Sequence, residues 1–118
     1  MPRKPRVSIV GVPEHIIQRG NNRQVIFASD GDMKAYVTWL KDYAEQFDVA
    51  IHAWVLMTNH VHILCTPGRQ YSISHMMQAL GRKYVQYFNR RYKRSGTLWA
   101  VHYTHLTLPT KRTETIPA

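Results

Sequence analysis

Hydrophobic residues at helical spacing mark two segments of the chain. In the first, apolar positions recur every three or four residues at Met33, Tyr36, Val37, Leu40, Tyr43, Ala44 and Phe47. In the second, which begins at Ser72, they fall at Ile73, Met76, Met77, Leu80, Tyr84, Tyr87 and Phe88. This period gathers the apolar side chains on one face of a helix. The pattern therefore predicts two amphipathic helices, and Asp30 or Asp32 is placed to cap the first turn of the first helix.

Three other segments have the composition of β-strands. Residues 50–57 (AIHAWVLM) and 60–66 (HVHILCT) are rich in β-forming residues, and the Thr-Asn pair between them predicts a turn. We expect residues 50–57 to form a buried strand and residues 60–66 to pair with it. A shorter strand is predicted over residues 13–18, followed by a turn at 19–23, because Gly and Asn tolerate left-handed backbone.

The order of these elements is strand, helix, strand, strand, helix. That order matches most of a split βαβ sandwich of the ferredoxin or RRM type. We therefore predict an α+β fold in which both helices lie on one face of an antiparallel sheet. At 118 residues the chain is expected to form one domain.

The charge of the chain is strongly asymmetric. Sixteen Lys and Arg against seven Asp and Glu give a net charge of +9 at pH 7. Between residues 49 and 113 there is no acid, and the basic residues are Arg69, Arg82, Lys83, Arg90, Arg91, Lys93, Arg94, Lys111 and Arg112. This excess, interleaved with tyrosines at 84, 87 and 92, is typical of nucleic-acid binding. The alternative is a solvated basic face without a dedicated partner.

Composition also bears on location. Cys65 is the only cysteine, which excludes an internal disulfide framework and fits a reducing compartment. Its alternation with Val61 and Ile63 places it on the core side of its strand. No apolar run approaches the roughly 18 residues of a membrane span, and the basic start lacks the long apolar region of a signal peptide. We expect a cytoplasmic protein that is associated with the nucleoid when it binds DNA.

The triplet His60-Val61-His62 is the clearest candidate site. Alternate side chains of a strand point to opposite faces, so the two histidines share one face while Val61 enters the core. Two neighbouring imidazoles can hold a divalent metal ion if a further ligand comes from elsewhere, with His52 as a possible neighbour. Solvent-facing or hydrogen-bonded histidines are the alternative. The other histidines have no spacing that links them to this triplet and are expected to be structural or incidental: His15, His75, His102 and His105.

Residues 56–64 (LMTNHVHIL) resemble the HUH motif of single-tyrosine transposases, in which a bulky apolar residue separates two histidines. The similarity is greatest to the REP-associated tyrosine transposase branch. Further family-like segments occur in the expected order at residues 15–23 (HIIQRGNNR), 26–27 (IF), 51–54 (IHAW), 84–89 (YVQYFN) and 95–99 (SGTLW). Together these segments cover residues 13–99.

The resemblance implies an enzyme that cuts and rejoins single-stranded DNA, often beside an imperfect hairpin. It implies that His60 and His62 hold Mg²⁺ or Mn²⁺, which polarises the scissile phosphate. A tyrosine would then attack phosphorus, form a 5′-phosphotyrosine link and release a 3′-OH. Related enzymes occur as monomers and as dimers, so a homodimer is one expected form.

Polar residues near the predicted turn and at the end of the second helix are expected to contact DNA. Arg and Asn supply the usual donors to phosphate and base edges. The candidates are Arg19, Asn21, Asn22, Arg23, Arg90, Arg91, Lys93 and Arg94. The alternatives are a plain turn for the first group and helix-dipole capping for the second.

The chain departs from the family pattern after Trp99. The family's nucleophilic tyrosine lies on a later helix, whereas residues 101–118 contain Pro109 and Pro117 and no helical period. Residues 101–110 (VHYTHLTLPT) resemble a translated sequencing adapter. We therefore expect residues 1–100 to be an incomplete HUH transposase domain, truncated at its C-terminal end, and residues 101–118 to be a non-family tail produced as an assembly artefact. A divergent natural C-terminus is the alternative.

Without that helix, Tyr84 is the fallback nucleophile, although its place on the apolar stripe favours core packing. The chain is then expected to bind metal and DNA but not to cut. Two other hypotheses stay open: a non-catalytic RRM-like module for single-stranded nucleic acid, and a metal-binding structural domain.

Overall fold

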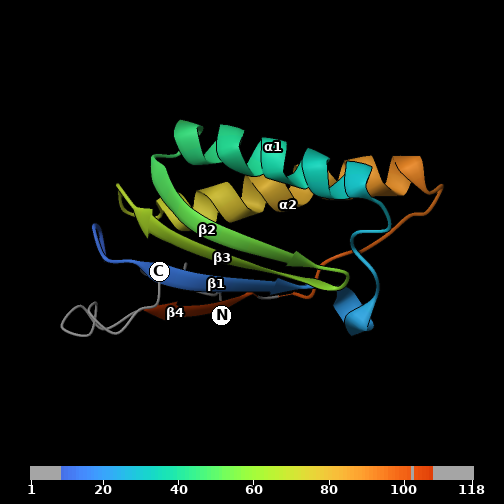
Figure 1. Ribbon diagram of the computed structural model, residues 1–118, viewed down its shortest axis with the longest axis horizontal. Coiled ribbons are helices and arrows are strands. Elements are labelled where there is room, and N and C mark those ends of the chain that lie inside the picture. Colours follow the sequence, from blue (N-terminus) through green and yellow to red (C-terminus); the bar gives the residue numbers. More distant parts are fainter. Residues whose placement is uncertain (1–8, 102, 108–118) are drawn as a thin grey trace, which may run out of the picture.

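The fold is a two-layer sandwich in which two helices cover one face of a four-stranded sheet (Figure 1). The computed structural model describes residues 9–101 and 103–107. The elements are β1 (Glu14–Arg19), the 3₁₀ turn η1 (Asn21–Arg23), α1 (Asp30–Gln46), β2 (Val49–Met57), β3 (His60–Pro67), α2 (Ser72–Arg91) and β4 (Thr104–Thr107). Strand order is β2-β3-β1-β4 and every neighbouring pair is antiparallel. The predicted α+β split βαβ sandwich is confirmed.

The core lies between the sheet and the helices. Along β3, side chains alternate between buried and half-buried, and Val61, Ile63 and Cys65 are fully buried toward the helices. The same alternation leaves His60 and His62 on the opposite face, which neither α1 nor α2 covers (Figure 1). The sheet therefore has one face that is buried against the helices and one open face. β3 is an inner strand, paired with β2 on one side and with β1 on the other.

Two local predictions are wrong. Residues 50–57 were expected to form a buried strand, but β2 is the edge of the sheet, and Ala53, Val55 and Met57 are exposed on its open face. The β-forming composition of β2 reflects pairing with β3 rather than burial on both faces. The first helix is capped by Ser29, whose hydroxyl accepts from the backbone N–H of Asp32, and not by Asp30 or Asp32.

The segment expected to lie outside the family domain contains β4, which pairs with β1. This strand is not predicted from the sequence pattern, because it is short and lacks a clear apolar alternation. Its addition completes the βαββαβ order. The origin of residues 101–118 stays a prediction. Among the described residues, neither helix combines the length and apolar character needed to cross a membrane.

The turn after β1 is held tightly against the rest of the molecule. The backbone N–H of Gly20 donates to the carbonyl of Asn59 at 2.9 Å, and Gly20 also forms a bridge with Trp99. A side chain at Gly20 would place its Cβ 2.4 Å from the carbonyl oxygen of Gln24, so only glycine fits there. This packing fixes the end of β1 beside the start of β3.

Candidate metal and nucleic-acid site

The histidine pair lies side by side on the open face of the sheet. The ring centroids of His60 and His62 are 4.9 Å apart, with an angle of 69° between the ring planes. Both side chains are half-buried, so they are neither splayed to opposite faces nor sealed in a dry interior. The arrangement expected from strand geometry is present in the structure.

The second nitrogen of each ring is held by a neighbour. Nδ1 of His60 lies 2.8 Å from Oδ1 of Asn59, which can only accept, so Nδ1 carries the proton and donates. Nδ1 of His62 lies 2.9 Å from Nε2 of His15 on β1. The rings of His15 and His62 are also stacked, with centroids 5.1 Å apart. Among the described residues no hydrogen-bond partner occupies Nε2 of His60 or of His62, and Nε2 of His62 has a free lone pair when its Nδ1 donates to His15.

The electrostatic environment favours a neutral His62. Burial lowers the pKa of His62 below its usual value, and the nearby His15, His60 and Arg19 lower it further. Arg19 stands opposite His60 in the β1–β3 register, at the exposed end of β1. Neutral imidazole is the form that binds metals, so the lowered pKa of His62 favours its metal-binding form at neutral pH.

The donor set fits a cation that takes part of its ligands from outside the protein. Two Nε2 atoms are available, whereas no group of three His, Cys, Asp or Glu side chains placed to hold a metal occurs among residues 9–101 and 103–107. The remaining positions would fall to water or to phosphate oxygens, the ligands that Mg²⁺ and Mn²⁺ accept readily. A shallow pocket of about 160 Å³ adjoins His62 and includes His15 and Val55 in its lining.

The structure brings His15, not His52, to the histidine pair. His52 lies at a bulge in β2, and its Nε2 is 2.7 Å from the hydroxyl of Thr66. His15 was expected to be structural because no spacing linked it to the motif. The alternation of β1 places it on the open face, but its pairing opposite Leu64, beside His62, depends on a register that one strand alone cannot reveal.

The turn residues proposed to contact DNA lie near the histidines in the fold. Asn22 and Arg23 are exposed in η1, and Asn22 adopts the left-handed backbone that asparagine tolerates, with φ 52°. The backbone N–H of Asn21 donates to the carbonyl of Leu98. Arg19 and this turn therefore form a polar rim at one end of the open face.

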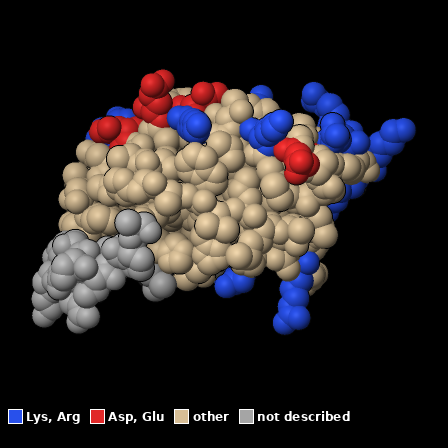
Figure 2. All heavy atoms as spheres, viewed as in Figure 1, with Lys and Arg blue, Asp and Glu red and all other residues tan. Residues whose placement is uncertain are grey.

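Of the four basic residues at the end of α2, Arg91 and Arg94 have partners within the protein, whereas Arg90 and Lys93 are exposed. Arg90 and Lys93 are exposed and have no acidic partner within the described part of the chain. Nε of Arg91 lies 3.4 Å from Oδ1 of the buried Asp32. The guanidinium of Arg94 donates to Asn89, Gln24 and the carbonyl of Thr97. Figure 2 shows Lys and Arg gathered at this end of the molecule.

The tyrosines of α2 are engaged inside the protein. Tyr84 is fully buried on the helix side of the sheet, and its hydroxyl donates to the carbonyl of Ile26. Burial, and then the nearby Asp32, raise the pKa of Tyr84. The hydroxyls of Tyr87 and Tyr92 each donate to Asp32 at 2.6 Å. The structure does not bring Tyr84 to the histidines, and its placement matches the packing role expected for it.

The sequence matches a known family model, and the fold is similar to that of solved structures. The sequence model of the IS200-like transposases matches residues 9–118. A candidate transposase from Deinococcus radiodurans is similar over 97% of this chain and 91% of that one, with a TM-score of 0.68 and 21% identity. A REP-associated tyrosine transposase bound to a REP hairpin is similar over 92% of this chain, with a TM-score of 0.63 and 15% identity, and the matched region spans 63% of that protein. At these identities the structural likeness shows the fold alone. No curated protein matches the chain.

Proposed function

This chain belongs to the family of IS200-like transposases, and from that premise we propose that its open sheet face binds a divalent cation between His60 and His62 and presents it to single-stranded DNA. The observation that carries the proposal is the pair of adjacent imidazoles whose Nδ1 atoms have partners, while no described residue occupies either Nε2 atom. Each Nε2 can bind a cation when the Nδ1 of the same ring carries the proton. A rigid inner strand holds both side chains, so the two donors keep a fixed separation.

The residues of this face would have distinct tasks. His60 and His62 would hold Mg²⁺ or Mn²⁺, which when bound polarises the scissile phosphate. His15 keeps the ring of His62 in place through its hydrogen bond and its stacking contact. Arg19, beside His60, supplies a positive charge where a DNA phosphate would approach.

The proposed DNA partner is a hairpin with a single-stranded flank, in keeping with the hairpin bound by the REP-associated relative. In the reaction that the family resemblance implies, a tyrosine hydroxyl attacks phosphorus, the P–O3′ bond breaks, and a 5′-phosphotyrosine and a free 3′-OH result. Reversal of this step rejoins the strand. The hydroxyls of Tyr84, Tyr87 and Tyr92 are engaged on the helix side of the sheet, so we propose that none of these three tyrosines is the nucleophile.

The second candidate function is a non-catalytic module for single-stranded nucleic acid. The four-stranded sheet with one open face favours it, since RRM-like modules bind RNA on that face. The two functions differ in their dependence on metal. A module that needs no cation should bind DNA equally with and without Mn²⁺.

The deciding experiment measures binding of a fluorescent hairpin with a single-stranded flank by anisotropy, in EDTA and in MnCl₂. We expect Mn²⁺ to strengthen binding by the wild type and to have no effect on His60→Ala or His62→Ala. His52→Ala is the matched control, because His52 lies on the same face but, within the described part of the chain, is hydrogen-bonded to Thr66 and not to the histidine pair. Equal binding in EDTA and Mn²⁺ by the wild type would favour the metal-independent module.

A further inference from the structure

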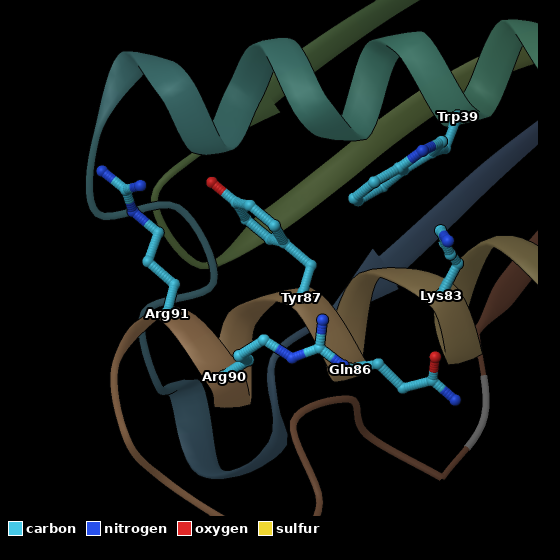
Figure 3. Close-up of a pocket in the computed structure, with 6 residues that line it drawn as sticks. All are labelled: Trp39, Lys83, Gln86, Tyr87, Arg90 and Arg91. Carbon is cyan, nitrogen blue, oxygen red and sulfur yellow. The ribbon is translucent and has the colours of Figure 1, made fainter.

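A groove of about 380 Å³ lies between the two helices, on the side of the sheet away from the histidines (Figure 3). One lining residue comes from α1 and the others from the second half of α2. They are Trp39, Lys83, Gln86, Tyr87, Arg90 and Arg91. No acidic residue is among them, so the groove is positively charged. Its volume is within the range of about 300–1,000 Å³ found for small-molecule clefts.

The groove combines flat aromatic surfaces with cations. Trp39 and Tyr87 are half-buried, and their rings meet edge to face with centroids 5.4 Å apart. Nζ of Lys83 lies 5.4 Å from the centroid of the Trp39 ring. Lys83 and Arg90 are exposed and have no acidic partner among the residues that the structure describes, unlike Arg91, which is paired with Asp32. Neither Lys83 nor Arg90 is neutralised by a described carboxylate, so both can pair with an anion.

This chemistry matches a nucleotide. Proteins that bind single strands stack bases on aromatic rings and pair phosphates with Lys and Arg. We infer that the groove binds one nucleotide of single-stranded DNA, with its base against Trp39 and Tyr87 and its phosphate against Lys83 and Arg90. This inference rests on the proposed function for its choice of nucleic acid. A duplex would present its phosphates but would keep its bases out of reach.

The groove and the histidine pair lie on opposite sides of the sheet, and this separation indicates the role of the groove. It lies on the helix side, whereas the histidines lie on the open face, so the nucleotide it holds is remote from the phosphate presented to the cation. Exposed Lys93 and Arg23 lie toward the end of the molecule where α2 stops and η1 packs, and Figure 2 shows basic side chains gathered there. A strand passing around this end would occupy both sites. The groove would anchor DNA outside the cleavage region.

The test compares the double variant Lys83→Gln/Arg90→Gln with the wild type, using a labelled decathymidine in EDTA. Losing two phosphate contacts should weaken binding roughly 10- to 30-fold at about 0.1 M salt. Lys41→Gln is the matched control, because Nζ of Lys41 also lies 5.4 Å from a tryptophan ring, that of Trp54. It should bind like the wild type. Quenching of tryptophan fluorescence by DNA should largely disappear in Trp39→Phe.

Several outcomes would overturn the inference. These are an equal loss in Lys41→Gln, undiminished affinity in the double variant, or fluorescence quenching that persists in Trp39→Phe. Competition by polyglutamate as effective as that by unlabelled decathymidine would instead assign the groove to an acidic protein segment. If Mn²⁺ does not change DNA binding by the wild type, while the double variant still binds decathymidine more weakly than the wild type, the proposed metal site is refuted and the proposed groove is not.

Discussion

Nε2 of His15 lies 2.9 Å from Nδ1 of His62, and the two rings stack at a centroid distance of 5.1 Å. The two residues are 47 positions apart and meet because β1 and β3 are paired in the sheet. If the Nδ1–H of His62 donates to His15, the lone pair of Nε2 points away from the contact and toward solvent. His15 would then act as a positioning residue for a proposed metal ligand.

Replacing His15 with phenylalanine tests this role. The substitution keeps a flat ring against His62 and removes the hydrogen bond. Because partners of metal ligands typically contribute about 10- to 100-fold in metal affinity, we expect a loss of that size for Mn²⁺. Isothermal titration calorimetry measures it directly. His75→Phe, on the exposed side of α2, is the control and should bind Mn²⁺ like the wild type. Unchanged affinity in His15→Phe would assign His15 a packing role only.

The contrast between His15 and His62 shows what the sequence could predict. Strand alternation was enough to place His60 and His62 on one face, because both belong to one strand. The α+β fold followed similarly from local periodicity. His15 required the register between two strands, and the exposed position of β2 required knowledge of which strand forms the sheet edge. Both depend on contacts between distant segments, which a single sequence does not encode locally.

Arg94 illustrates the same limit for charge. From the sequence it belongs to a run of four cations at the end of α2, all expected to contact DNA. In the structure its guanidinium donates to Gln24, Asn89 and the carbonyl of Thr97, so it ties the loop after α2 to the segment after η1. Only the fold distinguishes it from its neighbours.

Arg94→Ala should therefore lower stability. A well-formed hydrogen bond to a charged group contributes about 1.5–3 kcal/mol. The bonds of Arg94 are only part-buried or exposed, so each contributes less, and we expect a total decrease of about 2 kcal/mol in the free energy of unfolding. Urea denaturation followed by tryptophan fluorescence provides the measurement. Arg90→Ala is the control, since Arg90 has no such partners among the residues that the structure describes, and its midpoint should match the wild type. A wild-type midpoint for Arg94→Ala would show that the network is dispensable.

Lys93 is expected to act on DNA and not on stability. It is exposed and has no acidic partner among the described residues. If it contacts one phosphate, Lys93→Ala should reduce the slope of log K against log salt by about 0.7 for a single strand. Binding of decathymidine at several NaCl concentrations measures this slope. Lys34→Ala on α1 serves for comparison. A slope equal to that of the wild type would remove Lys93 from the proposed DNA path.

Tyr84→Phe separates packing from catalysis. The hydroxyl of Tyr84 donates to the carbonyl of Ile26 inside the core. Leaving that carbonyl without a donor should decrease the free energy of unfolding by about 1–3 kcal/mol, whereas Mn²⁺ affinity should stay unchanged. Tyr43→Phe is the control, because Tyr43 is only partly buried. Any strand cleavage by this chain that disappears in Tyr84→Phe, with Mn²⁺ binding intact, would reinstate Tyr84 as the nucleophile.

Asp32 couples the two helices through a buried carboxylate. It accepts hydrogen bonds from Tyr87 and Tyr92 near the end of α2 and from the backbone N–H of Ala28 before α1, and it lies beside Arg91. Burial alone would raise the pKa of Asp32, but these hydrogen bonds and the positive charge outweigh it, so the pKa falls below its ordinary value of 3.8. The ionised form is therefore the one that stabilises the fold.

The lowered pKa of Asp32 predicts how the free energy of unfolding depends on pH. A carboxyl whose folded-state pKa is depressed contributes fully above its unfolded-state pKa, and the contribution is lost as pH falls through the folded-state pKa. Asp32→Asn should reduce the free energy of unfolding by about 2 kcal/mol at pH 7, from hydrogen bonds to a charged group. The difference between variant and wild type should shrink as pH falls below 3.8. Urea titrations at pH 7, 5 and 3 measure it, with the exposed Asp42→Asn as control. A difference that stays constant down to pH 3 would mean that Asp32 stabilises the helix pair through packing and not through its charge.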